Sequence, residues 1–308
     1  MGRGARKPTG FRHINGILLL DKPKGVSSNQ ALQKIRHLFK ANKAGHTGSL
    51  DPLATGMLPI CFGEATKFSA YLLNAGKSYR ASCQLGKTTT TGDAEGEVTS
   101  QQPVSLDRLE VEAVLRQFIG QIEQIPPMYS ALKVQGQRLY RLARNGVTIE
   151  RATRIIEIHS LELVEFQSNQ LVIDVFCSKG TYLRTLAEDI GQSLGCGAYL
   201  SDLCRTGVHP FWRQRCYSLK TLQNLADLSN QSLGACLLPV QAALSDFPVL
   251  TITHDAAKLL QQGRVISSDA AIQPGLFRLV NENGHFIGMG ETADNGLISP
   301  KRLMNTLT

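Results

Sequence analysis

The octapeptide GHTGSLDP, residues 45–52, carries one acidic side chain, Asp51, set among glycines and followed by a proline. By local rules, an aspartate in such a segment is most often a turn former. The longer span GHTGSLDPLATGMLPI has neither a helical nor a strand period, however, and such a segment is unfavourable inside an apolar domain unless it shapes a site. A lone carboxylate can act as a nucleophile or as a base. Asp51 is therefore a candidate catalytic residue, with a structural turn as the alternative.

A second candidate is Arg184 in GTYLR, residues 180–184, where an apolar strand leads into a helix. A cation in the first turn opposes the helix dipole, so a buried arginine at this place needs a carboxylate partner. That partner is either a structural acid of the core or a site acid such as Asp51. Both interpretations stay open, because the sequence gives no distance between the two residues.

Basic side chains gather between residues 133 and 154, in KVQGQRLYRLARNGVTIERATR, against one acid, Glu150. The cations of this stretch are Lys133, Arg138, Arg141, Arg144, Arg151 and Arg154. Three of the arginines are three residues apart, so a helix would place them along one side, where they can neutralise successive phosphates. The alternative is a solvated helix face. A formal net charge of +8 and a basic segment at residues 1–12 favour a nucleic-acid partner.

Other classes of function have little support. Gly86-Lys87-Thr88 resembles the end of a phosphate-binding loop, but the first glycine of that motif is missing and the polar residues after it do not open a helix. The seven cysteines and seven histidines are scattered without zinc-type pairs, so we expect no metal and no cofactor. Dispersed thiols and the lack of an apolar run of membrane length predict a cytoplasmic protein without a membrane partner.

The elements that must position these residues follow from apolar periodicity. Strands are expected at residues 16–20, 58–62, 79–85, 155–164 and 171–177, and helices at 28–39, 64–73, 106–119 and 181–194. We expect Ser27-Ser28 and Ser105 to cap helices and Gly195 to end one in a left-handed conformation. In the helix at 106–119, the expected buried face consists of Leu106, Leu109, Val111, Leu115, Phe118 and Ile119.

The sequence changes character near residue 247. A strand at 247–253, a helix at 255–262 and short strands over 275–304 are expected, with hairpin turns at Asn283-Gly284 and Asn295-Gly296. This pattern predicts a small β-rich domain at residues 247–308. The chain then divides into a flexible basic tail at 1–12, a catalytic domain at 13–246 and this C-terminal domain.

Across the candidate site residues and the segments around them, the chain closely resembles the TruB family of bacterial tRNA pseudouridine synthases. The resemblance is nearly full length and runs in order through GILLLDKPKGVSS, GHTGSLDPLATGMLPICFGEATKF, KSYRA, TTTGDAEGE, IPPMYSALKVQGQRLYRLARNG and KGTYLRTLAEDIG. It implies an α+β fold: a catalytic domain of mixed α/β character around a largely antiparallel sheet, an RNA-clasping insertion at about residues 124–154, and a PUA-like RNA-binding domain at the C-terminus.

The resemblance also implies roles for single residues. Asp51 matches the essential aspartate, Arg184 the arginine that pairs with it, and Tyr79 the tyrosine that lies against the target base. His46 matches the histidine that helps fill the space left when the base leaves its stack. Further positions implied in or near the pocket are Leu203, Tyr182, Lys22 and Asp93, and those implied in RNA binding are Arg205 and the insertion's Lys133, Arg138, Arg141, Arg144 and Arg154.

Two positions depart from the family pattern AHLxxLRRT, which reads AYLSDLCRT in this chain. Tyr199 stands for the usual histidine and Cys204 for the usual arginine. Neither change touches the acid. We expect at most a weaker phosphate or base contact near Cys204.

The implied activity is the isomerisation of uridine 55 to pseudouridine in the T-arm of tRNA by a monomeric enzyme. The target base is stacked in folded RNA, so it must be flipped into the pocket. The sequence does not decide whether Asp51 attacks C1′, adds to the base or removes the C2′ proton. The alternative function is a non-catalytic tRNA-binding or tRNA-folding protein, in which Asp51 and Arg184 form a structural pair.

Overall fold

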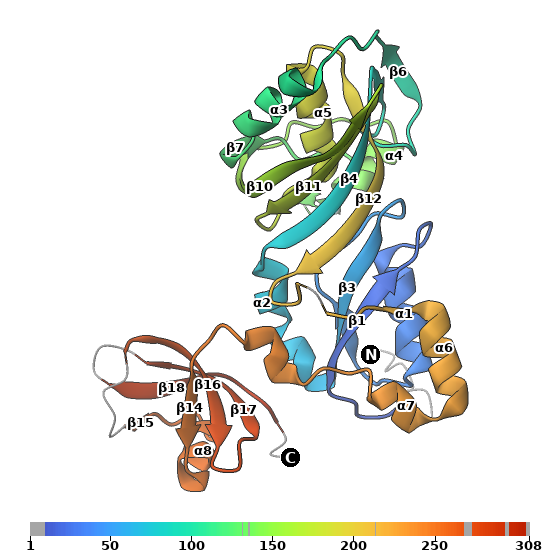
Figure 1. Ribbon diagram of the computed structural model, residues 1–308. Coiled ribbons are helices and arrows are strands. Elements are labelled where there is room, and N and C mark those ends of the chain that lie inside the picture. Colours follow the sequence, from blue (N-terminus) through green and yellow to red (C-terminus); the bar gives the residue numbers. More distant parts are fainter. Residues whose placement is uncertain are drawn as a thin grey trace.

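The computed structural model describes residues 10–130, 132–134, 136–212, 214–267, 273–292 and 296–305, so most of the basic tail expected at 1–12 lies outside the described residues. A large sheet covered by helices forms the main body, and a smaller β domain lies beside its lower end in the view of Figure 1. In the described part of the chain, no helix is long and apolar enough to cross a membrane.

The main sheet has the strand order β13-β1-β3-β12-β4-β11-β10-β7, and β2 pairs with β3. Its strands are β1 (Gly16–Lys22), β2 (Ala44–His46), β3 (Thr55–Phe62), β4 (Lys77–Leu85), β7 (Gly120–Gln124), β10 (Arg154–Gln167), β11 (Gln170–Cys177), β12 (Ala198–Val208) and β13 (Tyr217–Ser218). The pairs β1–β13 and β12–β3 are parallel, whereas β1–β3, β4–β12, β4–β11, β10–β11 and β7–β10 are antiparallel. The largely antiparallel mixed sheet expected from the sequence is confirmed.

Strand β4 shows why the sheet has a buried face. Alternate side chains from Lys77 to Leu85 are buried, and those between them are more exposed, as the two-residue period of a strand requires. The buried side chains Ala81, Cys83 and Leu85 join one core with α5 (Leu183–Ser193) and α3 (Arg108–Gln117). A second core lies between β1, β3, α1 (Ser28–Leu38) and α6 (Leu219–Leu228).

The helix starts follow from their caps, with one correction. Ser27 caps α1 as expected: its side chain accepts from the Gln30 backbone N–H, and Gln30 returns the bond in a capping box. Helix α3, by contrast, is capped by Asp107, which forms a capping box with Glu110, so the prediction of Ser105 was wrong. The glutamate needed for a capping box stands three residues after Asp107.

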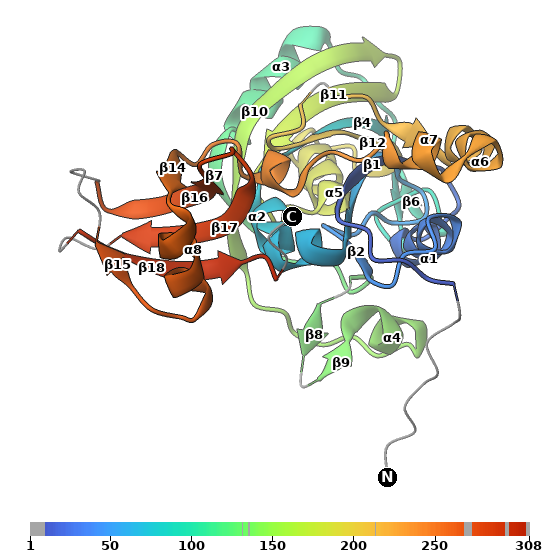
Figure 2. The same ribbon diagram turned by 90° about the horizontal axis from the view of Figure 1, so that it is seen from below.

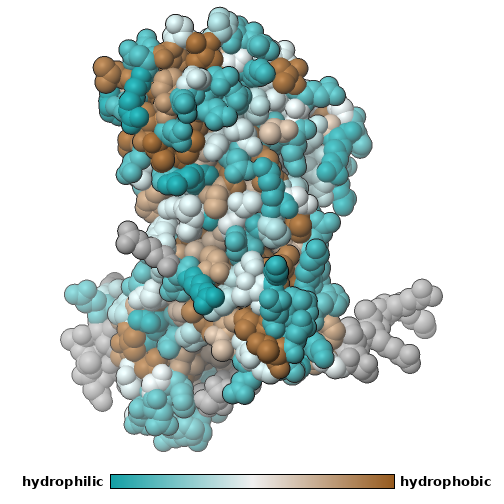
Figure 3. Space-filling model, turned by 45° about the vertical axis from the view of Figure 1, so that its right-hand side comes forward, coloured by the Kyte–Doolittle hydropathy of each residue, from teal (hydrophilic) through white to brown (hydrophobic). Residues whose placement is uncertain are grey.

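The expected apolar face of α3 is also only partly correct. Val111 and Leu115 are buried, but Leu109 is 72% exposed. Hydrophobic residues are visible on the surface at the top of the molecule in Figure 3, the end at which α3 lies in Figure 1. Burial of every apolar residue on a stripe is not required, because much of any protein surface is apolar.

The remaining elements of the main body are short. They are the 3₁₀ helices η1 (Gly63–Phe68) and η2 (Val240–Leu244), the helices α2 (Ser69–Asn74) and α7 (Asn230–Gly234), and the hairpin β5 (Lys87–Thr89) with β6 (Val98–Gln101). Between β7 and β10, residues 125–153 form the insertion, which carries the hairpin β8 (Lys133–Val134) with β9 (Gln137–Arg138) and the helix α4 (Leu139–Arg144). Figure 2 shows β8, β9 and α4 standing away from the sheet.

The C-terminal domain is built on a sheet of order β14-β16-β17-β18-β15. Its elements are β14 (Val249–Ile252), α8 (His254–Gln261), β15 (Ile266–Ser267), β16 (Gly275–Asn281), β17 (Phe286–Thr292) and β18 (Leu297–Leu303). The hairpin turn expected at Asn283-Gly284 joins β16 to β17, whereas Asn295 lies outside the described residues. Lys67 of η1 bridges the two domains by donating to the Leu303 carbonyl and the Asn305 side chain.

Candidate active site

The loop that follows β2 carries Asp51 to the rim of a pocket. The Thr47 backbone N–H donates to the Pro59 carbonyl at 3.1 Å, and the Gly48 carbonyl accepts from Arg205 Nη2 at 3.1 Å. Gly48 has φ +86°, and a Cβ there would lie 3.3 Å from the Lys77 side chain, so only glycine fits without strain. The loop backbone is thus fixed, while the Asp51 side chain stays half exposed.

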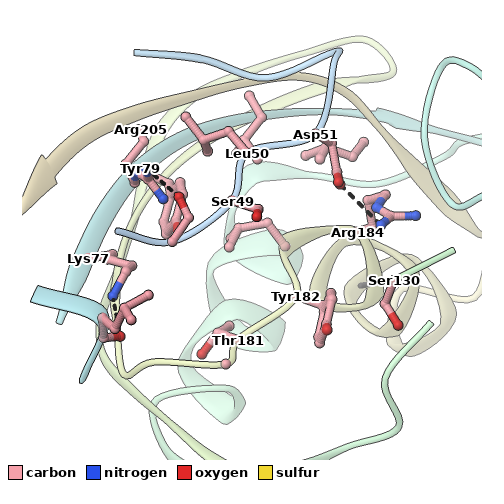
Figure 4. Close-up of a pocket in the computed structure, with 16 residues that line it drawn as sticks. Ser49, Leu50, Asp51, Lys77, Tyr79, Ser130, Thr181, Tyr182, Arg184 and Arg205 are labelled. Atoms are coloured by element: carbon pink, nitrogen blue, oxygen red, sulfur yellow. Dashed lines mark hydrogen bonds and ion pairs between the residues drawn. The ribbon is translucent and has the colours of Figure 1, made fainter. Parts of the chain in front are cut away.

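Arg184 is the partner of Asp51. Its Nη2 lies 3.1 Å from Asp51 Oδ2, and the two side chains face each other across the pocket rim in Figure 4. Arg184 stands in the first turn of α5, as predicted, and its side chain is only 5% exposed. An arginine buried to this extent needs more acceptors than one half-exposed carboxylate.

Those acceptors come from two other segments, the loop after β5 and the insertion. Arg184 Nε lies 3.5 Å from Asp93 Oδ2, Nη1 donates to the Thr91 carbonyl at 3.2 Å, and Nη2 donates to the Tyr129 carbonyl at 2.6 Å. Asp93 is itself buried and accepts from the Thr91 hydroxyl and the Glu95 backbone N–H. Arg184 therefore has both partners that the sequence left open, a structural acid in Asp93 and a pocket acid in Asp51.

A pocket of about 300 Å³ opens beside this ion pair. Tyr79 and Leu203 lie in its wall, and Tyr182 lies where α5 begins. Its lining residues are Gly48, Ser49, Leu50, Asp51, Leu73, Lys77, Tyr79, Ser130, Gly180, Thr181, Tyr182, Leu183, Arg184, Leu200, Leu203 and Arg205. A wall that combines leucine and tyrosine side chains with charged and hydroxyl groups suits an organic ligand whose orientation must be fixed.

Lys22 and Asp93, expected near this pocket, lie behind its wall and are not among the described residues that line it. Lys22 Nζ donates to the Val26 carbonyl at 2.6 Å and to the Pro23 carbonyl at 3.0 Å. Burial lowers the pKa of Lys22 to about 8, although the Asp51 charge opposes that shift. Asp51 thus has one buried cation in direct contact, Arg184, and interacts through its charge with a second, Lys22.

The far wall of the pocket is formed by Tyr79 and two further cations. Burial raises the pKa of the Tyr79 hydroxyl, so the phenol keeps its proton at neutral pH, and the nearby Arg205 charge opposes the shift. Burial, followed by repulsion from Arg205, lowers the pKa of Lys77 to about 8. Lys77 Nζ donates to the carbonyls of Ala75 at 2.7 Å and Leu73 at 3.1 Å, close to the end of α2.

Arg205 and His46, for which the resemblance implies RNA contacts, are less exposed than the arginines Arg138, Arg141 and Arg144 of the insertion. Arg205 is 1% exposed, and it donates through Nε to the Met57 carbonyl at 2.7 Å as well as to Gly48. Its position is that of a wall residue that holds the loop, and in this conformation the side chain does not reach a phosphate outside the pocket. His46 is partly buried in β2, and burial followed by the Arg205 charge lowers its pKa. Within the described part of the chain, its buried Nδ1 has no hydrogen-bond partner.

The cations of the insertion lie on the surface. Lys133, Arg138 and Arg141 line a groove around β8, β9 and α4, and Arg138 and Arg144 lie over the Tyr140 ring at 6.0 and 5.6 Å. Arg154, also exposed, opens β10. An exposed basic surface fits phosphate binding and a solvated face equally well, so the geometry leaves this prediction untested.

Comparison with known proteins identifies the family. The model of the TruB family pseudouridylate synthase N-terminal domain matches residues 36–183, that of the tRNA pseudouridylate synthase B C-terminal domain matches 184–245, and that of the pseudouridine synthase II TruB C-terminus matches 248–304. The tRNA pseudouridine synthase B of Ectopseudomonas mendocina (strain ymp) is 52% identical over 296 residues, which are 96% of this chain and 97% of that protein. The chain belongs to the TruB family of pseudouridine synthases.

Further relatives agree with membership of the TruB family. The tRNA pseudouridine synthase B of Methylobacillus flagellatus is 52% identical over 95% of this chain and 96% of that protein. The crystal structure of a Cbf5-Nop10-Gar1 complex contains a chain that superposes with a TM-score of 0.72 at 25% identity, covering 94% of this chain and 85% of that one. The structure of an H/ACA RNP bound to a substrate RNA containing 2′-deoxyuridine has the same fold, with a TM-score of 0.73 at 23% identity. As a TruB-family pseudouridine synthase, the protein is an RNA-modifying isomerase.

The two departures from the TruB pattern lie outside the pocket. Neither Tyr199 nor Cys204 is among the described residues that line it. Cys204 is partly exposed on β12 and packs beside Gly56, where a Cβ would lie 2.9 Å from its Sγ.

Sequence reasoning missed several residues that hold the site together. Gln124 accepts from the Tyr182 backbone N–H at 2.7 Å and donates to the Tyr182 carbonyl at 3.0 Å, which ties β7 to the start of α5. Ser28 makes an equivalent pair of bonds to Leu50. For Gln124 no local signal exists, whereas for Ser28 the signal was a second serine at a helix start that needs only one cap.

Proposed function

We propose that this TruB-family protein converts uridine 55 in the T-arm of tRNA to pseudouridine, with Asp51 as the catalytic carboxylate. The observation that carries the proposal is the 3.1 Å ion pair between Asp51 and Arg184 at the rim of the pocket that contains Tyr79. The relatives named tRNA pseudouridine synthase B supply the substrate class.

The chemistry needs one carboxylate. The N1–C1′ bond of the uridine breaks, a C5–C1′ bond forms, C5 loses a proton and N1 gains one, so the reaction is a redox-neutral isomerisation. An ionised aspartate can serve as nucleophile or base in such a reaction and is regenerated at the end. Arg184 pairs with this carboxylate at 3.1 Å, and its guanidinium is the kind of group that binds a carboxylate well.

The pocket fits a nucleobase that has left its stack. In this proposal the flipped uracil stacks on Tyr79, a contact worth roughly 1–3 kcal/mol, while Leu203 supplies an apolar surface. Tyr182 closes the same pocket near Arg184. Lys22 and Asp93 support the ion pair from behind the wall.

RNA outside the pocket is held by other parts of the chain. We assign phosphate contacts to the insertion's exposed cations, and we assign to His46, the last residue of β2 before the Asp51 loop, a contact with the RNA that the base has left. We further propose that the PUA-like C-terminal domain contributes RNA contacts and that the enzyme acts in the cytoplasm as a monomer. Light scattering of the protein alone and with one tRNA tests the monomer.

The test compares wild type with Asp51→Asn and a control, Asp174→Asn, whose carboxylate pairs with Arg80 on the surface. Each protein is incubated with unmodified tRNA, pseudouridine is mapped by position, and tRNA affinity is measured in parallel. We expect Asp51→Asn to bind tRNA and form no pseudouridine, and Asp174→Asn to behave as wild type. Conversion of uridine 55 by Asp51→Asn at the wild-type rate would show that Asp51 is not the catalytic carboxylate, whereas tRNA binding without pseudouridine formation by wild type would favour the non-catalytic alternative.

A further inference from the structure

The first residue of α1 contacts the Asp51 loop instead of capping its own helix. Ser28 is 4% exposed, and its hydroxyl donates to the Leu50 carbonyl at 3.0 Å and accepts from the Leu50 backbone N–H at 2.7 Å. A hydroxyl has one proton and two lone pairs, so both bonds form at once. Both polar groups of the Leu50 backbone are therefore satisfied by a single side chain.

The helix does not need this hydroxyl. Ser27 makes the capping interaction with the Gln30 backbone N–H, and the Gln30 side chain completes the capping box. Two adjacent serines at one helix start thus have different roles: Ser27 caps the helix, and Ser28 bonds to the loop.

A second bond holds the other side of Asp51. The Gly25 backbone N–H donates to the Pro52 carbonyl at 2.8 Å. Residues 50 and 52 are therefore both tied to the segment 25–28, and the Leu50 side chain is buried in the core that also contains Tyr79 and Leu203. Asp51 is the half-exposed residue between these two anchors, and in Figure 4 its side chain points to Arg184.

From these contacts we propose that Ser28 is a positioning residue for catalysis: its hydroxyl fixes the Leu50 peptide and thereby holds the Asp51 carboxylate at the pocket rim. This inference rests on the proposed function of Asp51. A catalytic group displaced by about 1 Å can lose on the order of a hundredfold in rate, even when the change lies outside the reacting atoms. Removal of the hydroxyl leaves the Leu50 N–H and carbonyl unpaired in a buried place, so the loop must shift to satisfy them.

The experiment uses Ser28→Ala with Ser27→Ala as the matched control. Both changes remove one hydroxyl at the start of α1, but only Ser28 contacts the loop. The measurements are the single-turnover rate of pseudouridine formation at saturating T-arm RNA, the Kd for that RNA and the Tm of each protein. For Ser28→Ala we expect a rate loss of about tenfold or more with Kd within about threefold of wild type, and for Ser27→Ala a rate within about twofold of wild type even if Tm falls.

A rate for Ser28→Ala within about twofold of wild type overturns the proposal, as does an equal rate loss in Ser27→Ala, which would mean that the rate follows the stability of α1. Should Ser28→Ala fail to fold, the near-isosteric Ser28→Cys, with its weaker donor, is held to the same criteria. The Asp51→Asn variant separates the two claims. An active Ser28→Ala beside an inactive Asp51→Asn refutes only the positioning role, whereas an active Asp51→Asn refutes the proposed catalytic residue itself.

Discussion

Because Arg184 is buried, we predict how much its replacement lowers the free energy of unfolding. In Arg184→Gln, Asp93 loses its cationic partner while its side chain is only 4% exposed, whereas Asp51 is half exposed and can be hydrated. Loss of one partner of a buried ion pair costs ~3–5 kcal/mol. Asp93 keeps hydrogen bonds from the Thr91 hydroxyl and the Glu95 N–H, so we expect the lower end, about 3 kcal/mol. For a domain of this size that corresponds to a fall of roughly 6–12 °C in Tm.

The double variant Arg184→Gln/Asp93→Asn separates stability from activity. It removes the uncompensated buried charge, so most of the lost free energy of unfolding should return, whereas pseudouridine formation should stay lost because Asp51 still lacks its partner. The assay is urea unfolding of wild type, both variants and the control Arg80→Gln, which breaks an exposed pair with Asp174 worth about 0–1 kcal/mol. An Arg184→Gln loss no larger than that of Arg80→Gln, or a double variant as unstable as Arg184→Gln, would show that Asp93 carries no uncompensated buried charge once Arg184 is removed.

Three further predictions follow from the described contacts. Arg141→Ala should weaken tRNA binding and reduce the slope of log Kd against log salt concentration, and an unchanged affinity across a salt series would identify a solvated face. Asp107→Ala should lower the free energy of unfolding by about 1 kcal/mol in urea titrations while Ser105→Ala leaves it unchanged, since only Asp107 caps α3; equal effects would contradict that cap. Burial lowers the pKa of Lys77 from 10.5 to about 8, so between these pH values the unfolded chain binds more protons than the folded chain. The free energy of unfolding of wild type should therefore rise relative to that of Lys77→Met from pH 8 to 10.5 and stay parallel to it below pH 8; parallel curves throughout would show that Lys77 is not desolvated.

Features that depend on local sequence were predictable. The start of α1 at Ser27, the pairing of β10 with β11 and the left-handed end of α5 at Gly195 follow from caps, alternation and glycine conformations that act over a few residues. The cap of α3 failed because Ser105 and Asp107 are both good N-cap residues, and the choice depends on Glu110 closing a capping box.

The site was predictable only in part, because its partners are far apart in sequence. The sequence indicated Asp51 and Arg184 and predicted a carboxylate beside the arginine. It did not show that Asp93 is a second such carboxylate, because that contact depends on how the loop after β5 packs against α5. The resemblance implies Arg205 in RNA binding, and its buried place beneath Gly48 depends on the packing of β12 against β3, which the sequence does not give. The second function of the Ser27-Ser28 pair was hidden for the same reason.

A crystal structure of Asp51→Asn bound to a T-arm RNA hairpin tests most directly whether Asp51 acts on a flipped uridine. We expect the target uridine out of its stack, with its base against Tyr79 and its reacting atoms within about 3–3.5 Å of the residue 51 side chain. A uridine that remains stacked in the RNA, or that lies outside the pocket lined by Tyr79, Arg184 and Leu203, would contradict it.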